Sequence, residues 1–253
     1  MKELAGKAAI ITGASRGIGE AAAKELASHG VSVALAARTK SDIDRIAEEI
    51  NASGGKAIAC TCDVSNYDDV RQVVEACLDN FSRLDILINN AGLIEPIARL
   101  ADSDPEHWSR IVDINFKGVY YGLRTAIPVM EQQGSGVIVN LSSGAATGAM
   151  EGWSHYCSTK AAVLSLTRCA DKEYGDRGIR VVGLSPGTVD TDMQVVIRAS
   201  GINPVSQLDP SVHKSPQVVA RALAWLCTED AADFAGVDFS MKDPNNLRRA
   251  GLG

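Results

Sequence analysis

The feature that most constrains this chain is an apolar run ending in a glycine-rich turn near the N-terminus. Residues 8–12 read Ala-Ala-Ile-Ile-Thr, and Gly13, Gly17 and Gly19 follow before an alanine- and leucine-rich stretch that reaches Ser28. This order predicts a buried strand that leads directly into a helix. Free backbone N–H groups and the positive end of the helix dipole converge at such a turn, so it indicates an anion site for a group such as a pyrophosphate.

The three glycines have different predicted roles. Gly13 permits a tight exit from the strand, Gly17 lets a pyrophosphate approach the backbone, and Gly19 lets the helix pack closely on the sheet. An ordinary glycine-rich turn is the alternative. Three residues separate the first two glycines, whereas the common dinucleotide fingerprint has one there. The pattern resembles Thr-Gly-x-x-x-Gly-x-Gly, the cofactor motif of the short-chain dehydrogenase/reductase family.

Apolar runs alternate with amphipathic segments along the rest of the chain, which is typical of a parallel sheet covered by helices. We expect further strands at residues 31–37, 56–61, 84–88, 136–141, 179–184 and 237–240, and helices at 41–52, 66–81, 105–132, 154–174 and 215–228. Ser41 is expected to cap the first of these helices, and Pro128 to kink or fray the third. Without a repeat or linker, residues 1–253 are predicted to form one α/β domain. It would be a doubly wound, Rossmann-type sheet of about seven strands with helices on both faces.

Composition argues against several classes of protein. Charged residues make up 22% of the chain and hydrophobic ones 45%, as in ordinary globular proteins. A net charge of −6 without a lysine or arginine cluster argues against a nucleic-acid partner. No signal-peptide core or membrane-length apolar run occurs, which predicts a cytoplasmic protein without a membrane partner. The six cysteines show no CxxC spacing and the four histidines no ligand pair, so neither a disulfide nor a metal site is expected.

The strand at 31–37 ends in Ala37, and Arg38 follows. An acidic side chain at this place accepts the ribose 2′-hydroxyl of NAD, whereas an arginine suits the 2′-phosphate of NADP. Arg16, in the glycine-rich turn, is a second cation, and two guanidinium groups can bind one phosphate. Each arginine alone is more often a surface residue. Together, without a competing carboxylate, they predict NADP(H) as the cofactor.

Tyr156 and Lys160 lie four residues apart, so in a helix they share one face. Many ordinary helices carry such a pair. A nearby cation is expected to lower the pKa of the phenol from its ordinary value of ~10. The tyrosine would then exchange a proton with an alcohol or carbonyl oxygen while a hydride moves at the carbon. Ser143, at the end of the strand at 136–141, would hold the same oxygen.

The resemblance to the short-chain dehydrogenase/reductase family covers about residues 7–193 through six ordered motifs. It implies a catalytic set of Asn115, Ser143, Tyr156 and Lys160. Ser143 is preferred to Ser142 because it lies thirteen positions before Tyr156. Asn115 would help to hold a water relay to the lysine, and the alternative is that it only bends its helix.

The same resemblance implies a line of cofactor contacts. Asp63 would accept the amino group of the adenine, although it would also suit the cap of the helix at 66–81. Asn89 is expected to be mainly structural, and the Pro-Gly-Thr-Val-Asp-Thr-Asp-Met run at 186–193 would cover the nicotinamide, with Thr191 at a phosphate. The residues predicted to bind the cofactor are Gly13, Ser15, Arg16, Gly17, Ile18, Gly19, Arg38, Asp63, Val64, Asn90, Ala91, Gly92, Tyr156, Lys160, Pro186, Gly187, Val189, Thr191 and Met193.

The resemblance implies an NADP(H)-dependent alcohol dehydrogenase or carbonyl reductase acting on a small carbonyl or alcohol substrate. A cofactor-binding sensor or scaffold without catalysis is the alternative. Residues 188–213 would cover a partly apolar substrate, because the segment contains Val195, Val196, Ile197, Ile202 and Val205.

Apolar residues on the helices at 105–132 and 154–174 predict a homo-oligomer, with a tetramer expected. The family often ends in a strand followed by Asp-Gly-Gly. Here Met241, Lys242, Asp243 and Pro244 follow the last strand, so an interface that depends on residues 237–253 is in question.

Overall fold

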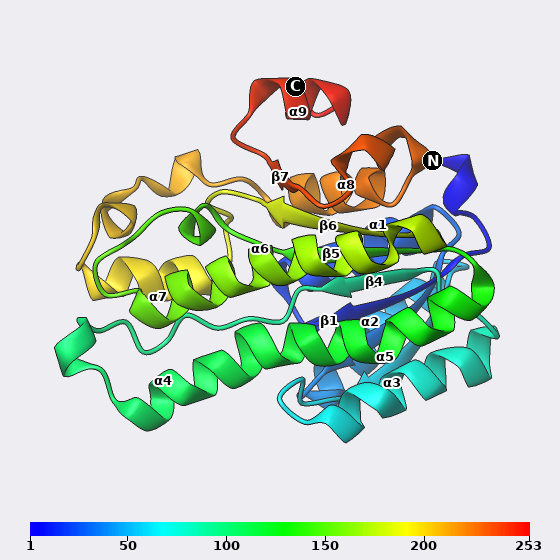
Figure 1. Cartoon of the computed structure of the whole chain (residues 1–253), viewed down its shortest axis with the longest axis horizontal. Coiled ribbons are helices and arrows are strands. Elements are labelled where there is room, and N and C mark those ends of the chain that lie inside the picture. The colour runs from blue at the N-terminus through cyan, green and yellow to red at the C-terminus, as the bar shows by residue number, and fades with distance from the viewer.

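Seven parallel strands form one sheet at the centre of the protein, in a computed structural model that describes residues 1–253 (Figure 1). The spatial order is β3-β2-β1-β4-β5-β6-β7. The chain starts at β1 and adds β2 and β3 on one side, and then returns to add β4 to β7 on the other side of β1. Every neighbouring pair is parallel, which confirms the predicted fold class. The strands are β1 (Ala8–Thr12), β2 (Ser32–Ala37), β3 (Lys56–Thr61), β4 (Ile86–Asn89), β5 (Gly136–Leu141), β6 (Ile179–Ser185) and β7 (Asp238–Ser240).

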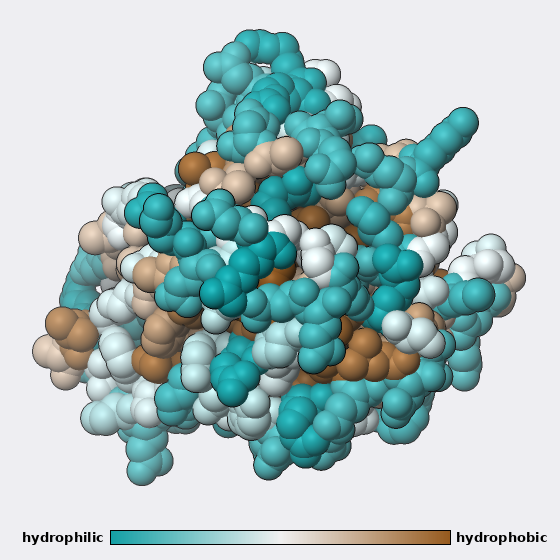
Figure 2. Space-filling model, turned by 45° about the vertical axis from the view of Figure 1, so that its right-hand side comes forward, coloured by the Kyte–Doolittle hydropathy of each residue, from teal (hydrophilic) through white to brown (hydrophobic).

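Helices cover both faces of the sheet. Successive side chains on a strand point to opposite faces, so Ile11 packs in the core with α1, α2 and α8, and Ile10 in the core with α3, α5 and α6. The helices are α1 (Gly17–Ser28), α2 (Lys40–Ala52), α3 (Tyr67–Phe81), α4 (Pro105–Val112), α5 (Gly118–Gln133), α6 (Ser154–Tyr174), α7 (Asp192–Ser200), α8 (Pro216–Leu226) and α9 (Pro244–Arg249). On the face drawn in Figure 2, polar side chains cover most of the surface and the apolar ones form small separate patches.

The long helical stretch predicted at 105–132 is interrupted by a π-helical turn, Asp113–Lys117, between α4 and α5. The fraying expected at Pro128 does not occur. The helix continues to Gln133 because Met130, beyond the proline, is fully buried in the core. The irregularity therefore lies around Asn115 instead.

Two predicted caps are wrong. Helix α2 begins at Lys40 after Thr39, without a side-chain cap, so Ser41 lies inside its first turn. Helix α3 is capped by Asn66, whose side chain accepts hydrogen bonds from the N–H groups of Asp68 at 2.9 Å and Asp69 at 3.4 Å. Asp63 is thus not the cap and remains available at the end of β3.

All seven strands end at the same edge of the sheet, on the left in Figure 1, where α7 and the loops before α4 and α6 extend beyond it. Residues 190–213 contain α7 and two short 3₁₀ turns, Pro204–Gln207 and Pro210–Val212. Helix α9, which the sequence analysis did not predict, follows β7. No helix is both long and apolar enough to span a membrane.

Candidate active site

A pocket of about 880 Å³ opens at this edge of the sheet. Its walls come from the β1–α1 turn, the ends of β2 to β6, helix α6, and the segment that includes α7. All residues predicted for the cofactor and for catalysis line it except Gly19 and Asn115. The structure therefore brings motifs from residues 13 to 193 to one cavity.

The β1–α1 turn is shaped by backbone contacts. Gly13 and Gly17 have φ values of +63° and +57°, which favour glycine. A Cβ atom on Gly19 would lie 2.2 Å from the Gly13 carbonyl oxygen, so only glycine fits where α1 meets the turn. Asn90, after β4, fixes the turn by donating from Nδ2 to the carbonyl oxygens of Thr12 at 2.9 Å and Gly13 at 3.1 Å.

This turn suits an anionic group. Helix α1 begins at Gly17 without any side-chain cap, so the N–H groups of its first turn have no partner from a capping side chain. A Cβ atom at Gly17 would lie 3.2 Å from Cγ2 of Thr191. Because glycine has no side chain, the space between the turn and Thr191 stays open. The residues present therefore fit the phosphates of a dinucleotide.

Charged residues at the ends of β2 and β3 line the next part of the pocket. Arg38 is exposed there, and Asp63 accepts hydrogen bonds from the N–H group and hydroxyl of Ser65 at 3.0 and 2.7 Å. Burial acts to raise the pKa of Asp63, but the Ser65 hydrogen bonds and the charges of Arg38 and Arg110 bring it below its ordinary value. Asp42 also lines this part of the pocket. No carboxylate stands at the end of β2 itself, where Ala37 lies, but Asp42 of α2 brings an unforeseen one to the same pocket.

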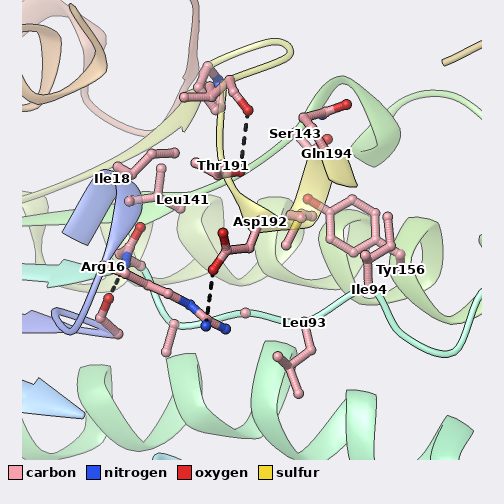
Figure 3. A pocket seen from close by; sticks show the side chains of 18 of the residues that line it. Arg16, Ile18, Leu93, Ile94, Leu141, Ser143, Tyr156, Thr191, Asp192 and Gln194 are labelled. Carbon is pink, nitrogen blue, oxygen red and sulfur yellow. Dashed lines mark hydrogen bonds and ion pairs between the residues drawn. The ribbon is translucent and has the colours of Figure 1, made fainter. Parts of the chain in front are cut away.

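Arg16 does not stand free as a second phosphate-binding cation. Its guanidinium forms an ion pair with Asp192 of α7 at 3.1 Å, as Figure 3 shows. The two side chains are 71% and 69% exposed, and ion pairs so open to water contribute little to stability. An incoming phosphate can therefore displace Asp192 at small cost.

Helix α6 brings Tyr156 and Lys160 to the wall of the pocket, which Ser143 also lines after the end of β5. Figure 3 shows Tyr156 and Ser143 in this pocket. The Lys160 Nζ atom lies 5.7 Å from the centre of the Tyr156 ring and donates a hydrogen bond to the carbonyl oxygen of Leu141 at 2.5 Å. Both side chains are buried, at 8% and 5% exposure. The phenol, the ammonium and the Ser143 hydroxyl are therefore gathered where they can act on one group.

Burial dominates the acid–base state of this pair. It raises the pKa of Tyr156 to about 12, and the Ser143 hydroxyl only partly offsets it. Burial lowers the pKa of Lys160 to about 8, against the charge of Asp238. The expectation that the lysine lowers the phenol pKa is therefore wrong for the protein without cofactor. The ammonium is directed at Leu141, and charge on either group is disfavoured by the loss of water.

Asn115 lies behind the pocket wall. Its side chain accepts a hydrogen bond from the Leu93 N–H group at 2.8 Å and donates to the Leu93 carbonyl at 2.7 Å. It also donates to Thr159 of α6 at 3.4 Å. The side chain thus joins the loop after β4 to α6 and is not directed at Lys160, and the π-helical turn supplies the irregularity that positions it.

The structure distinguishes the two serines after β5. Both serines line the pocket, but the buried Ser142 hydroxyl donates to Oδ2 of Asp238 at 3.2 Å, whereas the Ser143 hydroxyl is the hydrogen-bond partner of Tyr156. The other oxygen of Asp238 is buried without a hydrogen-bond partner, and burial raises the pKa of this carboxyl. The choice of Ser143 over Ser142 agrees with this arrangement. Likewise, Asn89 is buried and donates to Asn140 at 2.8 Å, joining β4 to β5.

Apolar side chains form the end of the pocket near Tyr156. Trp153 packs edge-on against the Tyr156 ring, with centroids 5.6 Å apart, and was not predicted from the sequence. Its position three residues before Tyr156 could have indicated the contact. Of the apolar residues expected over the substrate, Val196, Ile197 and Val205 line the pocket, whereas Val195 and Ile202 do not.

Comparisons with known proteins identify the family. The family model of short chain dehydrogenase matches residues 7–201. A 3-oxoacyl-[acyl-carrier-protein] reductase of Synechocystis sp. is 36% identical, with 92% of this chain and 94% of that protein covered. A cyclohexanol dehydrogenase of Acinetobacter sp. is 31% identical, with 92% of each chain covered.

Solved structures show the same likeness. A 3-ketoacyl-(acyl-carrier-protein) reductase from Brucella melitensis complexed with NADH has a TM-score of 0.85 at 34% identity, covering 94% of this chain and 97% of that one. NAD⁺-bound xylitol dehydrogenase has a TM-score of 0.88 at 25% identity, covering 95% and 99%. The protein described above is therefore an oxidoreductase that belongs to the short-chain dehydrogenase/reductase family.

Proposed function

We propose that the chain is an NADP(H)-dependent oxidoreductase that interconverts a secondary alcohol and a ketone, with one domain holding both cofactor and substrate. The observation that carries the proposal is the meeting of Ser143, Tyr156 and Lys160 on one wall of a pocket whose other end is the β1–α1 turn. A protein that only bound a cofactor would not need this set. Residues 188–213, which include α7, would cover the substrate.

The pKa values suggest how these groups act in ketone reduction. The bound cofactor supplies a hydride to the carbonyl carbon. Ser143 holds the carbonyl oxygen, and Tyr156, a neutral phenol below about pH 12, donates its proton to that oxygen. Lys160 carries a proton below about pH 8, and its Nζ atom lies 5.7 Å from the centre of the ring. Once the phenol has lost its proton, this ammonium would turn from the Leu141 carbonyl to the phenolate and return a proton to it. In alcohol oxidation the same steps run in reverse.

Arg38 after Ala37 supports NADP(H), and Asp42 opposes it. The solved relatives named above hold NADH or NAD⁺. NADPH and NADH oxidation by the unmodified protein decides the preference, and equal Michaelis constants would contradict NADP(H). The double change Ala37→Asp with Arg38→Gln should move the preference toward NAD(H), because it exchanges the phosphate-binding cation for a carboxylate.

The activity itself is tested by following NADPH and NADH oxidation with ketones, diketones and quinones. Turnover of a ketone supports the proposal. Tight cofactor binding, measured by nicotinamide fluorescence, with no turnover of any carbonyl compound would favour a sensor or scaffold instead.

We also propose a homo-oligomer, with a tetramer expected. Tyr120 on α5 and Tyr67 on α3 are 46% and 37% exposed and both pack against the Tyr121 ring, which leaves an aromatic cluster at the surface of these helices. Such a surface suits a symmetric contact between copies. Light scattering at micromolar concentration tests it, and a monomeric mass would contradict it.

A further inference from the structure

Lys242 occupies a place beside the catalytic wall. Strands β5, β6 and β7 are parallel neighbours, so the segments that follow them lie side by side at the pocket. Ser143 follows β5, Gly187 follows β6, and Lys242 follows β7. All three line the pocket. Lys242, which follows the edge strand β7, thus brings a positive charge to the pocket that Ser143 and Tyr156 line.

The Lys242 side chain lies beside two glycines. Its Cγ and Cε atoms lie 3.8 Å from the position that a Cβ atom would take on Gly187. Its Nζ atom lies 3.9 Å from the corresponding position on Gly144, the residue directly after Ser143. Any larger residue at 144 or 187 would place its side chain against the lysine. The Lys242 ammonium is therefore close to Gly144, the residue that follows Ser143, whose hydroxyl is proposed to hold the reacting oxygen.

Lys214 brings a second ammonium next to Gly187, although Lys214 itself does not line the pocket. Its Nζ atom lies 3.5 Å from the Cβ position of Gly187. Its backbone is fixed by hydrogen bonds with Thr188 at 3.0 Å and Asp190 at 2.9 Å. Neither Lys214 nor Lys242 forms an ion pair, whereas Arg16, at the cofactor end, is paired with Asp192. Two unpaired cations therefore flank Gly187.

Apolar side chains also line this pocket. They include Ile94, Trp153 and Val196 together with Met150 and Val205. A substrate in the pocket would therefore meet hydrocarbon as well as the Lys242 ammonium, and the carboxylates of Glu95 and Asp190 line the pocket too. The cofactor's phosphates do not account for these lysines, because the turn at Gly17 and the arginine after β2 provide for them elsewhere in the pocket.

We infer that the substrate is an oxo acid or the matching hydroxy acid, with its carboxylate bound by Lys242, a second positive charge supplied beside Gly187 by Lys214, and its apolar arm against Trp153 and Val196. The inference rests on the proposed ketone–alcohol chemistry. A carboxylate on an ammonium forms a charge-assisted hydrogen bond, which is stronger than a neutral one. Lys242 and Lys214 would then determine specificity without taking part in proton transfer.

The test compares linear oxo acids, with the carbonyl moved stepwise away from the carboxylate, with the corresponding primary amides. We expect kcat/KM to favour the best acid over its amide by roughly ten- to hundred-fold, the range for a hydrogen bond to a charged group. Lys242→Met should reduce that ratio by about the same factor, Lys214→Met by less, and Lys242→Arg should retain most of it. Lys56→Met, an exposed lysine at the start of β3, is the control and should leave the ratio unchanged.

Binding separates this inference from the proposed function. Affinity of the saturated carboxylate and its amide for the protein loaded with NADP⁺ is measured by calorimetry, without turnover. A preference for the carboxylate that Lys242→Met abolishes supports the inference even if no ketone is reduced. Equal affinity for acid and amide, or an acid-to-amide ratio that Lys242→Met does not change, would overturn it while leaving ketone reduction intact.

Discussion

The two ends of the pocket are built in different ways. At the cofactor end, backbone meets backbone: a Cβ atom on Gly19 would overlap the carbonyl oxygen of Gly13, and one on Gly13 would lie 2.9 Å from Cα of Ala91. At the substrate end, side chains form the wall, with Trp153 against Tyr156 and Val196 arriving from α7. The cofactor end tolerates few residue types, whereas the substrate end can change its side chains and keep the fold.

The difference has a thermodynamic side. The cofactor end uses groups that cost little to order, because hydrogen bonds from Asn90 to the β1–α1 turn are satisfied within the protein. The substrate end buries Tyr156 and Lys160 against their preferred ionic states. Catalytic sites commonly carry such a cost in stability. Substitutions at the two ends should therefore have opposite consequences for stability and activity.

The largest effect is expected from Tyr156→Phe. This change removes the transferable proton and keeps the ring packed on Trp153, so turnover should fall by roughly 10²–10⁴-fold, as for other acid–base groups. NADPH affinity should hold, because phenylalanine keeps the ring that the cofactor would contact and leaves the β1–α1 turn unchanged. Steady-state kinetics and nicotinamide fluorescence measure the two quantities. Near-normal turnover would refute the role of Tyr156, and loss of NADPH binding would show that the two ends are not separable.

Lys160→Met should stabilise the protein while it abolishes turnover. Burial lowers the folded-state pKa of Lys160 from 10.5 to about 8, so the folded protein binds this proton more weakly than the unfolded chain does. Below pH 8 Lys160 is charged in the folded protein, so the full cost of burying its ammonium reduces the free energy of unfolding. Between pH 8 and 10.5 the unmodified protein becomes more stable as pH rises. The gain from the neutral methionine should approach roughly 3 kcal/mol near pH 7 as an upper bound and vanish toward pH 10.5.

Thermal unfolding of both proteins across this pH range measures that gain. Lys56→Met, which removes an exposed lysine, serves as the control and should show no pH-dependent difference. A Lys160→Met protein that is less stable at pH 7 would mean that the hydrogen bond to Leu141 outweighs the cost of burying the ammonium.

Two glycine substitutions compare the packed cofactor end with a loop outside the pocket. Gly19→Ala should destabilise the protein by roughly 1–3 kcal/mol, the usual cost of overpacking, and weaken NADPH binding, because its Cβ meets backbone that cannot move aside. Gly148→Ala, in the loop before α6, is the matched change: its Cβ would lie 3.4 Å from the Gly144 carbonyl oxygen, with no positive φ. It should leave unfolding and NADPH affinity nearly unchanged. Equal losses of stability and NADPH affinity from Gly19→Ala and Gly148→Ala would show that the cofactor end is not packed more tightly than the loop.

The contrast between the two ends of the pocket also explains which features could be predicted from the sequence. The bounds of β3, β5 and α6 coincide with those predicted, because glycines and changes of hydrophobic period mark them locally. The motifs of the cofactor end were also readable, since each consists of neighbouring residues whose backbone sets the shape. The seven-stranded parallel sheet followed from the alternation of strands and helices.

Misses arose where distant segments meet. The pairing of Arg16 with Asp192 joins residues far apart in the chain, and the raised pKa of Tyr156 depends on what covers the ring. The π-helical turn around Asn115 has no local signature beyond a polar residue in a helix. Asp42 lines the pocket from α2, and this depends on how that helix packs against the sheet. None of these can be read from spacing alone.

The smallest effect is expected in α7. Val196 lines the pocket, whereas its neighbour Val195 is 67% exposed and does not. Val196→Ala removes apolar surface next to the substrate, so kcat/KM for apolar ketones should fall by roughly 3- to 10-fold, the value of one or two methylene groups in a hydrophobic pocket. Val195→Ala makes the same chemical change outside the pocket and should alter kcat/KM by less than about 2-fold. NADPH affinity should be unchanged in both variants. If Val195→Ala had the larger effect, α7 would face the substrate with Val195 and not with Val196. The assignment of Val196 to the apolar lining would then be wrong.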